Sequence, residues 1–221
     1  RELGIERDDA LAVLLRNDFA FFEAAYAANR LGAHLVPINW HFSGAEVAYI
    51  LEDSGAKALV AHADLLEPIR TQIPASVRVF VVDTPSEIAA AYSIADARCH
   101  ARAGDVVWDT WLAEFELLPP EAVASPGSMI YTSGTTGRPK GAVHTHCGFP
   151  IKAAQDMAHA FDVQPGDTMY WVSDIGWMMG PWEIIGCFMH GGTIVITEGP
   201  PDFPTPERVW QMVERHGITT L

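Results

Sequence analysis

Cysteine is scarce in this chain, and the three residues present, Cys99, Cys147 and Cys187, lie far apart. They form no C-x-x-C pair. The sequence therefore predicts neither a disulfide framework nor a zinc site built on cysteine pairs. Reduced thiols suit a cytoplasmic protein, and that is the localisation we expect.

Long apolar runs and positive charge are also lacking. No apolar run approaches the roughly 18 residues of a membrane-spanning helix, and no signal-peptide pattern is present, so we expect no stable membrane span. There are 14 basic against 28 acidic residues, which gives a net charge of −14. This balance argues against nucleic acid or an anionic membrane as a partner. A local basic pocket remains possible around Arg138 and Lys140.

The chain does have enough apolar residues for a substantial core. It is 49% hydrophobic and 19% charged over 221 residues, a length that suits one large domain or two small ones. The first residue is Arg1, and Ile218 to Leu221 resemble the start of a strand. We therefore expect the sequence to be a fragment of a longer protein.

Strand-like and helix-like segments alternate in the first 82 residues. Asp18 is a candidate helix N-cap, Gly32 a helix end, and Ser43 with Glu46 a capping box. We expect strands at 10–15, 35–38, 58–61 and 77–82, and helices at 18–32, 43–55 and 64–71. This alternation predicts an α/β fold with mostly parallel sheets flanked by helices.

Residues 83–126 are less periodic and rich in proline, so we interpret them as an excursion or linker with one or two short helices. Trp108 and Trp111 are expected to pack it onto the core. Beyond it we expect strands at 142–146, 168–172 and 193–197. Helices are expected at 147–161, at 180–190, and from a Thr205-Pro206 cap to Gly217.

His144 and His146 lie two apart on an expected strand and hence on one face. Either a metal pair or a polar strand face would give this pattern. No third ligand is nearby in the sequence, so the pattern favours the polar face, and no metal site is expected.

A glycine- and threonine-rich stretch from Tyr131 to Gly141 reads Y-T-S-G-T-T-G-R-P-K-G and follows an expected strand at 128–131. Its glycines allow positive φ and close approach to a ligand, and successive backbone N–H groups can then face an anion. Hydroxyl groups and Lys140 complete a set that suits a polyphosphate. Pro139 before the lysine and Gly141 after it exclude the common phosphate-loop fingerprint. The alternative is a solvated turn without a ligand.

The string T-S-G-T-T-G-R-P-K-G closely resembles the phosphate-binding signature of the AMP-forming acyl-CoA synthetase family, part of the adenylate-forming superfamily. Residues 14–50 resemble the early part of its large N-terminal domain. Residues 174–221, with G-W-M-M-G-P-W and E-G-P-P-D-F-P-T-P-E-R, resemble its acetyl- and medium-chain-type members. The resemblance implies an incomplete N-terminal AMP-binding domain over 1–221. Residues 1–82 would be its first βα region, 83–126 the excursion, and 127–221 the phosphate-loop and substrate-pocket region. The small C-terminal domain is not in this sequence.

The resemblance also implies a function, an ATP-dependent ligase that converts a carboxylic acid into acyl-AMP and then acyl-CoA. It implies ATP, Mg²⁺ and coenzyme A, and a short- to medium-chain acid of the acetyl type. It assigns catalytic roles to Lys140 and Thr132. The ATP phosphates would be held by Thr132, Ser133, Gly134, Thr135, Thr136, Gly137 and Lys140. The family segments that contact adenine and ribose, and a second catalytic lysine, are not in this sequence, so we expect the fragment alone to be inactive.

An apolar segment from Ser173 to Trp182 lies between an expected strand and an expected helix. From composition alone, this segment is expected to be a loop that is buried by neighbouring segments and has no role in ligand binding. The resemblance instead implies a carboxylate pocket formed by Trp177, Met178, Met179 and Gly180.

Two other classes of function use the same features. A non-catalytic module would bind nucleotide at the glycine- and threonine-rich loop without turnover. An interaction domain would bind no nucleotide and would offer residues 177–182 to a partner.

Overall fold

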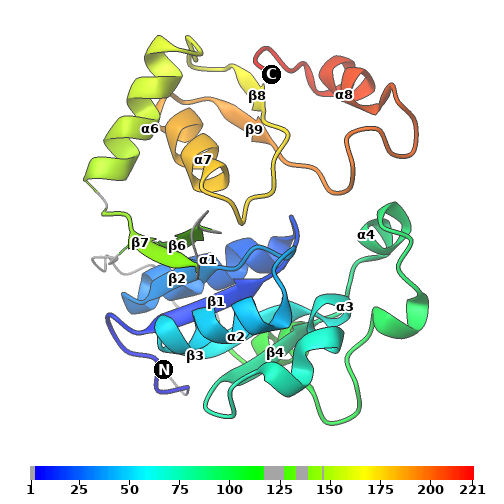
Figure 1. The fold of residues 1–221 in the computed structure, drawn as a ribbon. Helices are drawn as coiled ribbons and strands as arrows, with labels where there is room; N and C mark the ends of the chain where they lie inside the picture. The colour runs from blue at the N-terminus through cyan, green and yellow to red at the C-terminus, as the bar shows by residue number, and fades with distance from the viewer. Residues whose placement is uncertain (1–2, 117–126, 133–138, 146) are drawn as a thin grey trace.

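A parallel five-stranded sheet forms the first half of the computed structural model, which describes residues 3–116, 127–132, 139–145 and 147–221. The strand order is β2-β1-β3-β4-β5, and every neighbouring pair is parallel. The strands are β1 (Ala10–Leu14), β2 (His34–Pro37), β3 (Ala56–His62), β4 (Arg78–Val82) and β5 (Val106–Val107). The predicted α/β fold with mostly parallel strands is confirmed (Figure 1).

Helices α1 (Phe19–Leu31) and α2 (Gly44–Asp53) begin and end at the residues that local chemistry predicts. The carboxylate of Asp18 accepts the N–H of Phe19 at 2.6 Å, and Gly32 ends α1 with a φ of 71°. Ser43 and Glu46 form the reciprocal capping box of α2. These contacts satisfy N–H groups that the first turn leaves without partners.

The two helices bury opposite faces of the sheet. Alternate residues of β1 point to opposite sides, as strand geometry requires. Ala12 and Leu14 join a cluster with Val47 and Ile50 of α2. Leu11 and Val13 join a second cluster, which contains Ala20, Phe21, Ala24 and Ala28 of α1. The five-stranded sheet therefore has an apolar cluster on each of its two faces.

Residues 83–116 contain the expected short helices, α4 (Ser86–Ala91) and α5 (Trp108–Leu112), together with the 3₁₀ turn η2 (Asp96–Arg98). They also contain β5, which the sequence did not predict and which pairs with β4. Trp108 is 3% exposed and meets Phe80 edge-on at 5.6 Å, so its predicted packing role is confirmed. Residues 117–126 of the expected excursion lie outside the described residues.

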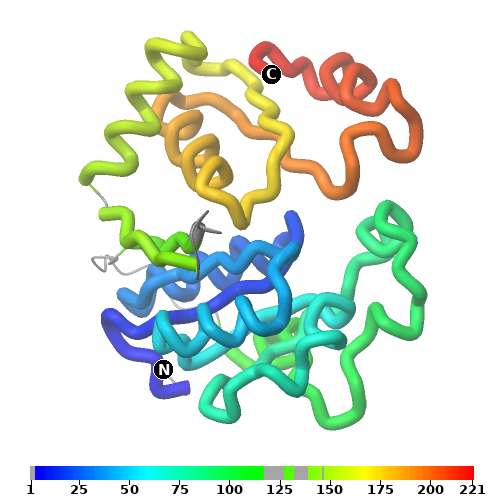
Figure 2. Tube along the Cα trace, in the orientation of Figure 1, coloured from blue at the N-terminus to red at the C-terminus, as the bar shows by residue number. Residues whose placement is uncertain are grey.

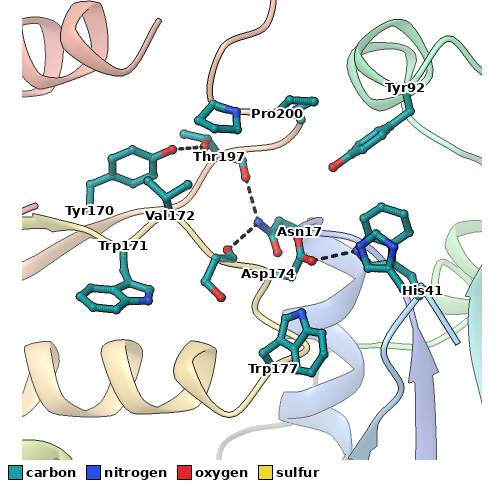
Figure 3. Close-up of a pocket in the computed structure, with 14 residues that line it drawn as sticks. Asn17, His41, Tyr92, Tyr170, Trp171, Val172, Asp174, Trp177, Thr197 and Pro200 are labelled. Atoms are coloured by element: carbon teal, nitrogen blue, oxygen red, sulfur yellow. Dashed lines mark hydrogen bonds between the residues drawn. The ribbon is translucent and has the colours of Figure 1, made fainter. Parts of the chain in front are cut away.

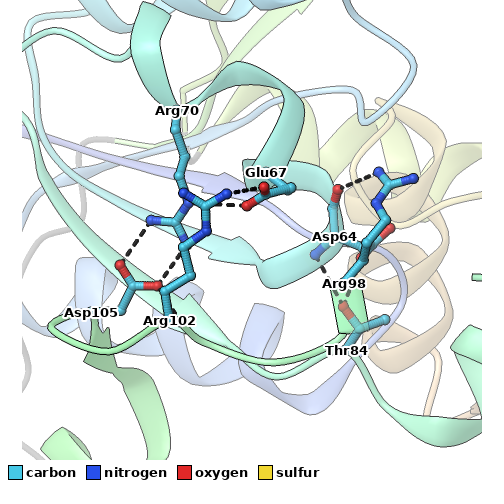
Figure 4. A network of polar contacts seen from close by, with 7 residues as sticks. All are labelled: Asp64, Glu67, Arg70, Thr84, Arg98, Arg102 and Asp105. Atoms are coloured by element: carbon cyan, nitrogen blue, oxygen red, sulfur yellow. Dashed lines mark hydrogen bonds and ion pairs between the residues drawn. The ribbon is translucent and has the colours of Figure 1, made fainter. Parts of the chain in front are cut away.

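Polar contacts connect this excursion to α3 (Ala63–Leu66) and η1 (Glu67–Gln72). Arg70 donates two hydrogen bonds to the carboxylate of Asp105, at 2.8 and 2.6 Å, and Arg102 pairs with Glu67 (Figure 4). The guanidinium of Arg70 lowers the pKa of Asp105. The expected helix at 64–71 is therefore a short α-helix continued by 3₁₀ turns, and ion pairs hold its end.

A two-stranded antiparallel hairpin, β6 (Met129–Thr132) and β7 (Lys140–Val143), lies beside β2. The strand expected at 142–146 is displaced, because β7 begins at Lys140 and His144 lies beyond its end. His146 lies outside the described residues. Figure 2 shows the hairpin at the junction between residues 3–116 and residues 147–221.

The second half places α6 (Gly148–His159) and α7 (Met179–Met189) against a parallel pair, β8 (Thr168–Tyr170) and β9 (Thr193–Val195). Helix α8 (Arg208–His216) ends at Gly217, as predicted, with a φ of 61°. The expected Thr205-Pro206 cap is wrong, because the helix starts at Arg208 with Glu207 as its N-cap. Thr205 instead accepts the N–H of Arg208 through its carbonyl group at 3.1 Å.

Candidate active site

A cavity of about 430 Å³ lies where the two parallel sheets face each other (Figure 3). Its walls come from the segments that follow β1, β2, β8 and β9, with Tyr92 added from the excursion. Open α/β sheets bind ligands beyond the carboxyl ends of their strands, and all four segments lie at such ends. The lining residues include Asn17, Trp40, His41, Tyr92, Tyr170, Asp174, Trp177 and Thr197.

Asn17 connects the two sheets at this cavity. Its amide nitrogen donates to the carbonyl oxygens of Thr197 at 2.9 Å and Ser173 at 3.3 Å. Its amide oxygen accepts the backbone N–H of Ile175 at 2.7 Å. One side chain at the end of β1 therefore holds the segments that follow both β8 and β9.

Two further hydrogen bonds order the cavity wall. The indole N–H of Trp40 donates to the carboxylate of Asp174 at 3.0 Å. The hydroxyl groups of Tyr170 and Thr197 lie 2.9 Å apart (Figure 3). Trp177 projects its ring to the same space and is 36% exposed. The wall is thus largely aromatic, with a few fixed polar groups, as in small-molecule sites.

A second cavity of about 360 Å³ shares Trp40 and Tyr92 with the first. The guanidinium of Arg16 lies 4.8 Å from the ring centroid of each of these two residues. It also donates to both carboxylate oxygens of Asp64, at 3.0 and 2.9 Å. Burial opposes the ionised form of Asp64, but hydrogen bonds from Arg16 and Thr84 outweigh it and lower the pKa of Asp64.

Glu198 lies between two residues that line the larger cavity. Burial raises its pKa to about 8, and the nearby negative charge of Asp174 acts in the same direction. No described group forms a hydrogen bond with its Oε1. Burial therefore favours the neutral form of Glu198.

The predicted phosphate loop connects the two strands of the β6–β7 hairpin. Thr132 and Lys140 are partners in the last described pair before the loop, and Lys140 is exposed. Five of the predicted phosphate-binding residues lie outside the described residues: Ser133, Gly134, Thr135, Thr136 and Gly137.

The hairpin and the aromatic cavity meet at helix α7. A small space of about 40 Å³ is bounded by Ile130 of β6 and by Pro181 and Ile185 of α7. Trp177 lies two residues before this helix begins. The helix thus connects the base of the glycine- and threonine-rich loop to the wall of the cavity.

The four predicted pocket residues have different surroundings. Trp177 lines the larger cavity, whereas the other three do not. Met178 is the N-cap of α7 and is 46% exposed, and Met179 packs against the apolar cluster beneath α6. Gly180 is buried, and a Cβ there would lie 2.3 Å from the carbonyl oxygen of Ile175.

Several cavity residues were missed by sequence reasoning. Asn17, Trp40 and His41 follow expected strands at the carboxyl edge, and that position is a signal that the sequence does carry. Thr197 ends the strand expected at 193–197 and carries the same signal. Tyr170 lies inside an expected strand and Tyr92 in the excursion, so neither of these two carries it.

No group of three or more His, Cys, Asp or Glu residues suited to a metal ion occurs among the described residues. Within the same parts of the chain, no helix has the length and apolar character needed to cross a membrane.

Comparison with known proteins gives matches along the whole chain. The family described as "AMP-binding enzyme" matches residues 1–221. Acetyl-coenzyme A synthetase 2 of Candida albicans is 33% identical over 224 residues, which cover 98% of this chain and 33% of that protein. The acetyl-coenzyme A synthetase of Pyrobaculum aerophilum is 42% identical over 105 residues, covering 46% of this chain and 16% of that protein. The chain spans about a third of the length of the first of these relatives.

Solved structures share the fold. Acetoacetyl-CoA synthetase from Streptomyces lividans aligns with a TM-score of 0.78 at 24% identity, over 99% of this chain and 34% of that one. An anthranilate CoA ligase in complex with anthranoyl-AMP aligns with a TM-score of 0.80 at 22% identity, over 99% of this chain and 40% of that one.

Proposed function

The chain belongs to the AMP-binding enzyme family, and on that premise we propose that it is part of an AMP-forming ligase that activates a carboxylic acid. A carboxylate oxygen attacks the α-phosphate of ATP, which gives an acyl adenylate and releases pyrophosphate. The thiol of coenzyme A then attacks the acyl carbon and displaces AMP, forming a thioester. The acyl adenylate is needed because a free carboxylate has no good leaving group.

The observation that carries this proposal is the position of the glycine- and threonine-rich loop between paired Thr132 and Lys140, on a hairpin that bounds a small space together with α7. In the proposal the β- and γ-phosphates of ATP bind Thr132, Ser133, Gly134, Thr135, Thr136, Gly137 and Lys140. Lys140 neutralises charge on the phosphates, and Mg²⁺ enters with the nucleotide and offsets more of it. Positioning and charge neutralisation are the main needs of phosphoryl-type transfer.

The aromatic cavity is the proposed site of the carboxylic acid. Trp177 and Tyr170 supply apolar surface. Glu198 lies between the lining residues Thr197 and Gly199, and its raised pKa lessens repulsion of the substrate carboxylate. A volume of about 430 Å³ exceeds the need of acetate and accommodates short- to medium-chain acids. Support comes from similarity to acetyl-coenzyme A synthetases and, in fold, to ligases that act on acetoacetate and anthranilate.

The chain covers about a third of the Candida albicans relative, so the activity is proposed for the full-length protein that contains it. We propose that residues 1–221 alone do not complete the reaction. A cytoplasmic location remains part of the proposal.

The experiment is ATP–pyrophosphate exchange by the full-length protein, with acids from acetate to long-chain fatty acids. Acid-dependent exchange supports the proposal and identifies the substrate class. ATP binding without exchange by any acid would favour a non-catalytic nucleotide-binding module. Folded protein that binds no nucleotide would favour an interaction domain.

A further inference from the structure

We propose that Asn17 is a positioning residue for the acid-binding cavity, because it holds the segment from Ser173 to Gly180 in place. The proposal rests on the proposed function, since it assigns the cavity to the carboxylic acid. Nothing in the glycine- and threonine-rich loop or in the Trp177 motif points to this residue, which lies 158 positions before its partner Ile175.

The contacts of Asn17 require an amide. Both N–H groups of its side chain donate to carbonyl oxygens, while its oxygen accepts an N–H group. An aspartate has no donors for the two carbonyl oxygens, and a serine is one atom too short to reach both sides. Among side chains of this length, only asparagine offers donors on one side and an acceptor on the other.

Ile175 transmits this constraint to the cavity wall. Its side chain is fully buried in the core on the α1 face of the first sheet, and its backbone N–H is held by Asn17. The next turn is tight, because the N–H of Trp177 donates to the carbonyl oxygen of Asp174 at 3.1 Å, and Gly180 packs directly on Ile175. A shift at Ile175 would therefore move the ring of Trp177.

The same amide also fixes the opposite wall. Thr197 accepts from Asn17 through its carbonyl oxygen, and its hydroxyl lies beside that of Tyr170. Loss of the amide would thus release the segments after β8 and β9 together. The Trp40–Asp174 hydrogen bond remains as a separate connection between the sheets, so an Asn17 variant keeps one tether.

The test uses the full-length protein with Asn17→Ala and Asn17→Asp. We expect the KM for the acid in the exchange assay to rise about tenfold in Asn17→Ala, with the KM for ATP changed by less than about twofold. Asn17→Asp keeps the acceptor for Ile175 but places a carboxylate against two carbonyl oxygens, so we expect at least the same rise. Hydrogen–deuterium exchange of the peptide at 171–180 should speed up in both variants.

The matched control is Glu23→Ala, which removes the acceptor of the Trp108 indole at 2.9 Å and so breaks a contact between elements away from the cavity. We expect it to leave both KM values and the 171–180 peptide unchanged. An unchanged acid KM, or unchanged deuterium uptake, in both Asn17 variants would overturn the positioning role. If the wild-type protein shows no exchange activity, the proposed function fails, while deuterium uptake still decides whether Asn17 holds this segment.

Discussion

The indole of Trp40 and the carboxylate of Asp174 meet at 3.0 Å, although 134 positions separate them in the sequence. This hydrogen bond joins the segment after β2 to the segment after β8, and both segments line the larger cavity. Trp40 also stacks beside the guanidinium of Arg16. Trp40 thus contacts both the segment after β8, through Asp174, and the buried ion pair of Arg16 with Asp64.

Trp40→Phe tests this connection, because it removes the donor and keeps a ring. We expect a loss of roughly 1–2 kcal/mol in the free energy of unfolding, measured by urea denaturation, since Asp174 loses a partner and the smaller ring packs less well. Trp210→Phe is the matched control: Trp210 is 65% exposed on α8, so its replacement should change stability by less than about 0.5 kcal/mol. Equal losses in the two variants would contradict the connection.

Asp64→Asn tests the buried pair with Arg16. Removing one partner of a buried ion pair leaves the other uncompensated, so we expect a loss of about 3 kcal/mol near pH 7. The folded state lowers the pKa of Asp64, so the stabilisation by this carboxylate is present above its unfolded pKa, near 3.8, and is lost as pH falls below that value.

The measurement is urea unfolding of wild-type and Asp64→Asn protein at a series of pH values from 7 to 3. The difference in the free energy of unfolding between the two proteins should become smaller only at the lowest pH values of the series. A difference that stays constant across the series would exclude the ion pair as its cause.

Glu183→Gln tests a buried acid on α7. Glu183 is 2% exposed, and burial raises its pKa to about 8 from 4.5. Between these values the folded state binds more protons than the unfolded state, so stability falls as pH rises. The slope from this one group approaches about 1.4 kcal/mol per pH unit, and glutamine removes it. The variant should gain stability relative to the wild type from pH 5 to pH 8, and parallel pH profiles would refute the assignment.

Gly180→Ala tests the tight turn below Trp177. The added Cβ would lie 2.3 Å from a backbone carbonyl oxygen, so the turn must shift, and we expect a loss of about 1–3 kcal/mol in thermal or urea unfolding. Gly176→Ala is the control within the same segment, because the nearest heavy atom to its Cβ would be 4.0 Å away. Equal free energies of unfolding for Gly180→Ala and Gly176→Ala would show that the turn can accommodate a Cβ at position 180 without cost.

Local chemistry was readable from the sequence, and long-range contacts were not. The Asp18 cap and the Ser43–Glu46 box depend on residues within one helical turn, so their prediction succeeded. Strand β5 was missed because two residues, Val106 and Val107, give too little periodicity to detect. The start of α8 was misplaced because Pro206 suits a first helical position, yet the helix begins two residues later.

The candidate site divides in the same way. Trp177 could be named from a motif, because the motif is contiguous. Asn17 follows an expected strand, but its partners could not be read from the sequence, because they lie more than 150 positions away. Tyr92 could not be named, because it reaches the cavity from the excursion. The phosphate-binding assignments of the glycine- and threonine-rich loop stay predictions, to be decided by measurement.

The most direct measurement compares Lys140→Ala with wild-type full-length protein in acid-dependent ATP–pyrophosphate exchange. Lys152→Ala is the control, since Lys152 is an exposed lysine on α6 that pairs with Asp156. We predict that Lys140→Ala raises the KM for ATP or lowers the exchange rate by about tenfold or more, while Lys152→Ala matches the wild type. Wild-type kinetics in Lys140→Ala would contradict the role of this lysine in binding the phosphates and, with it, the central claim.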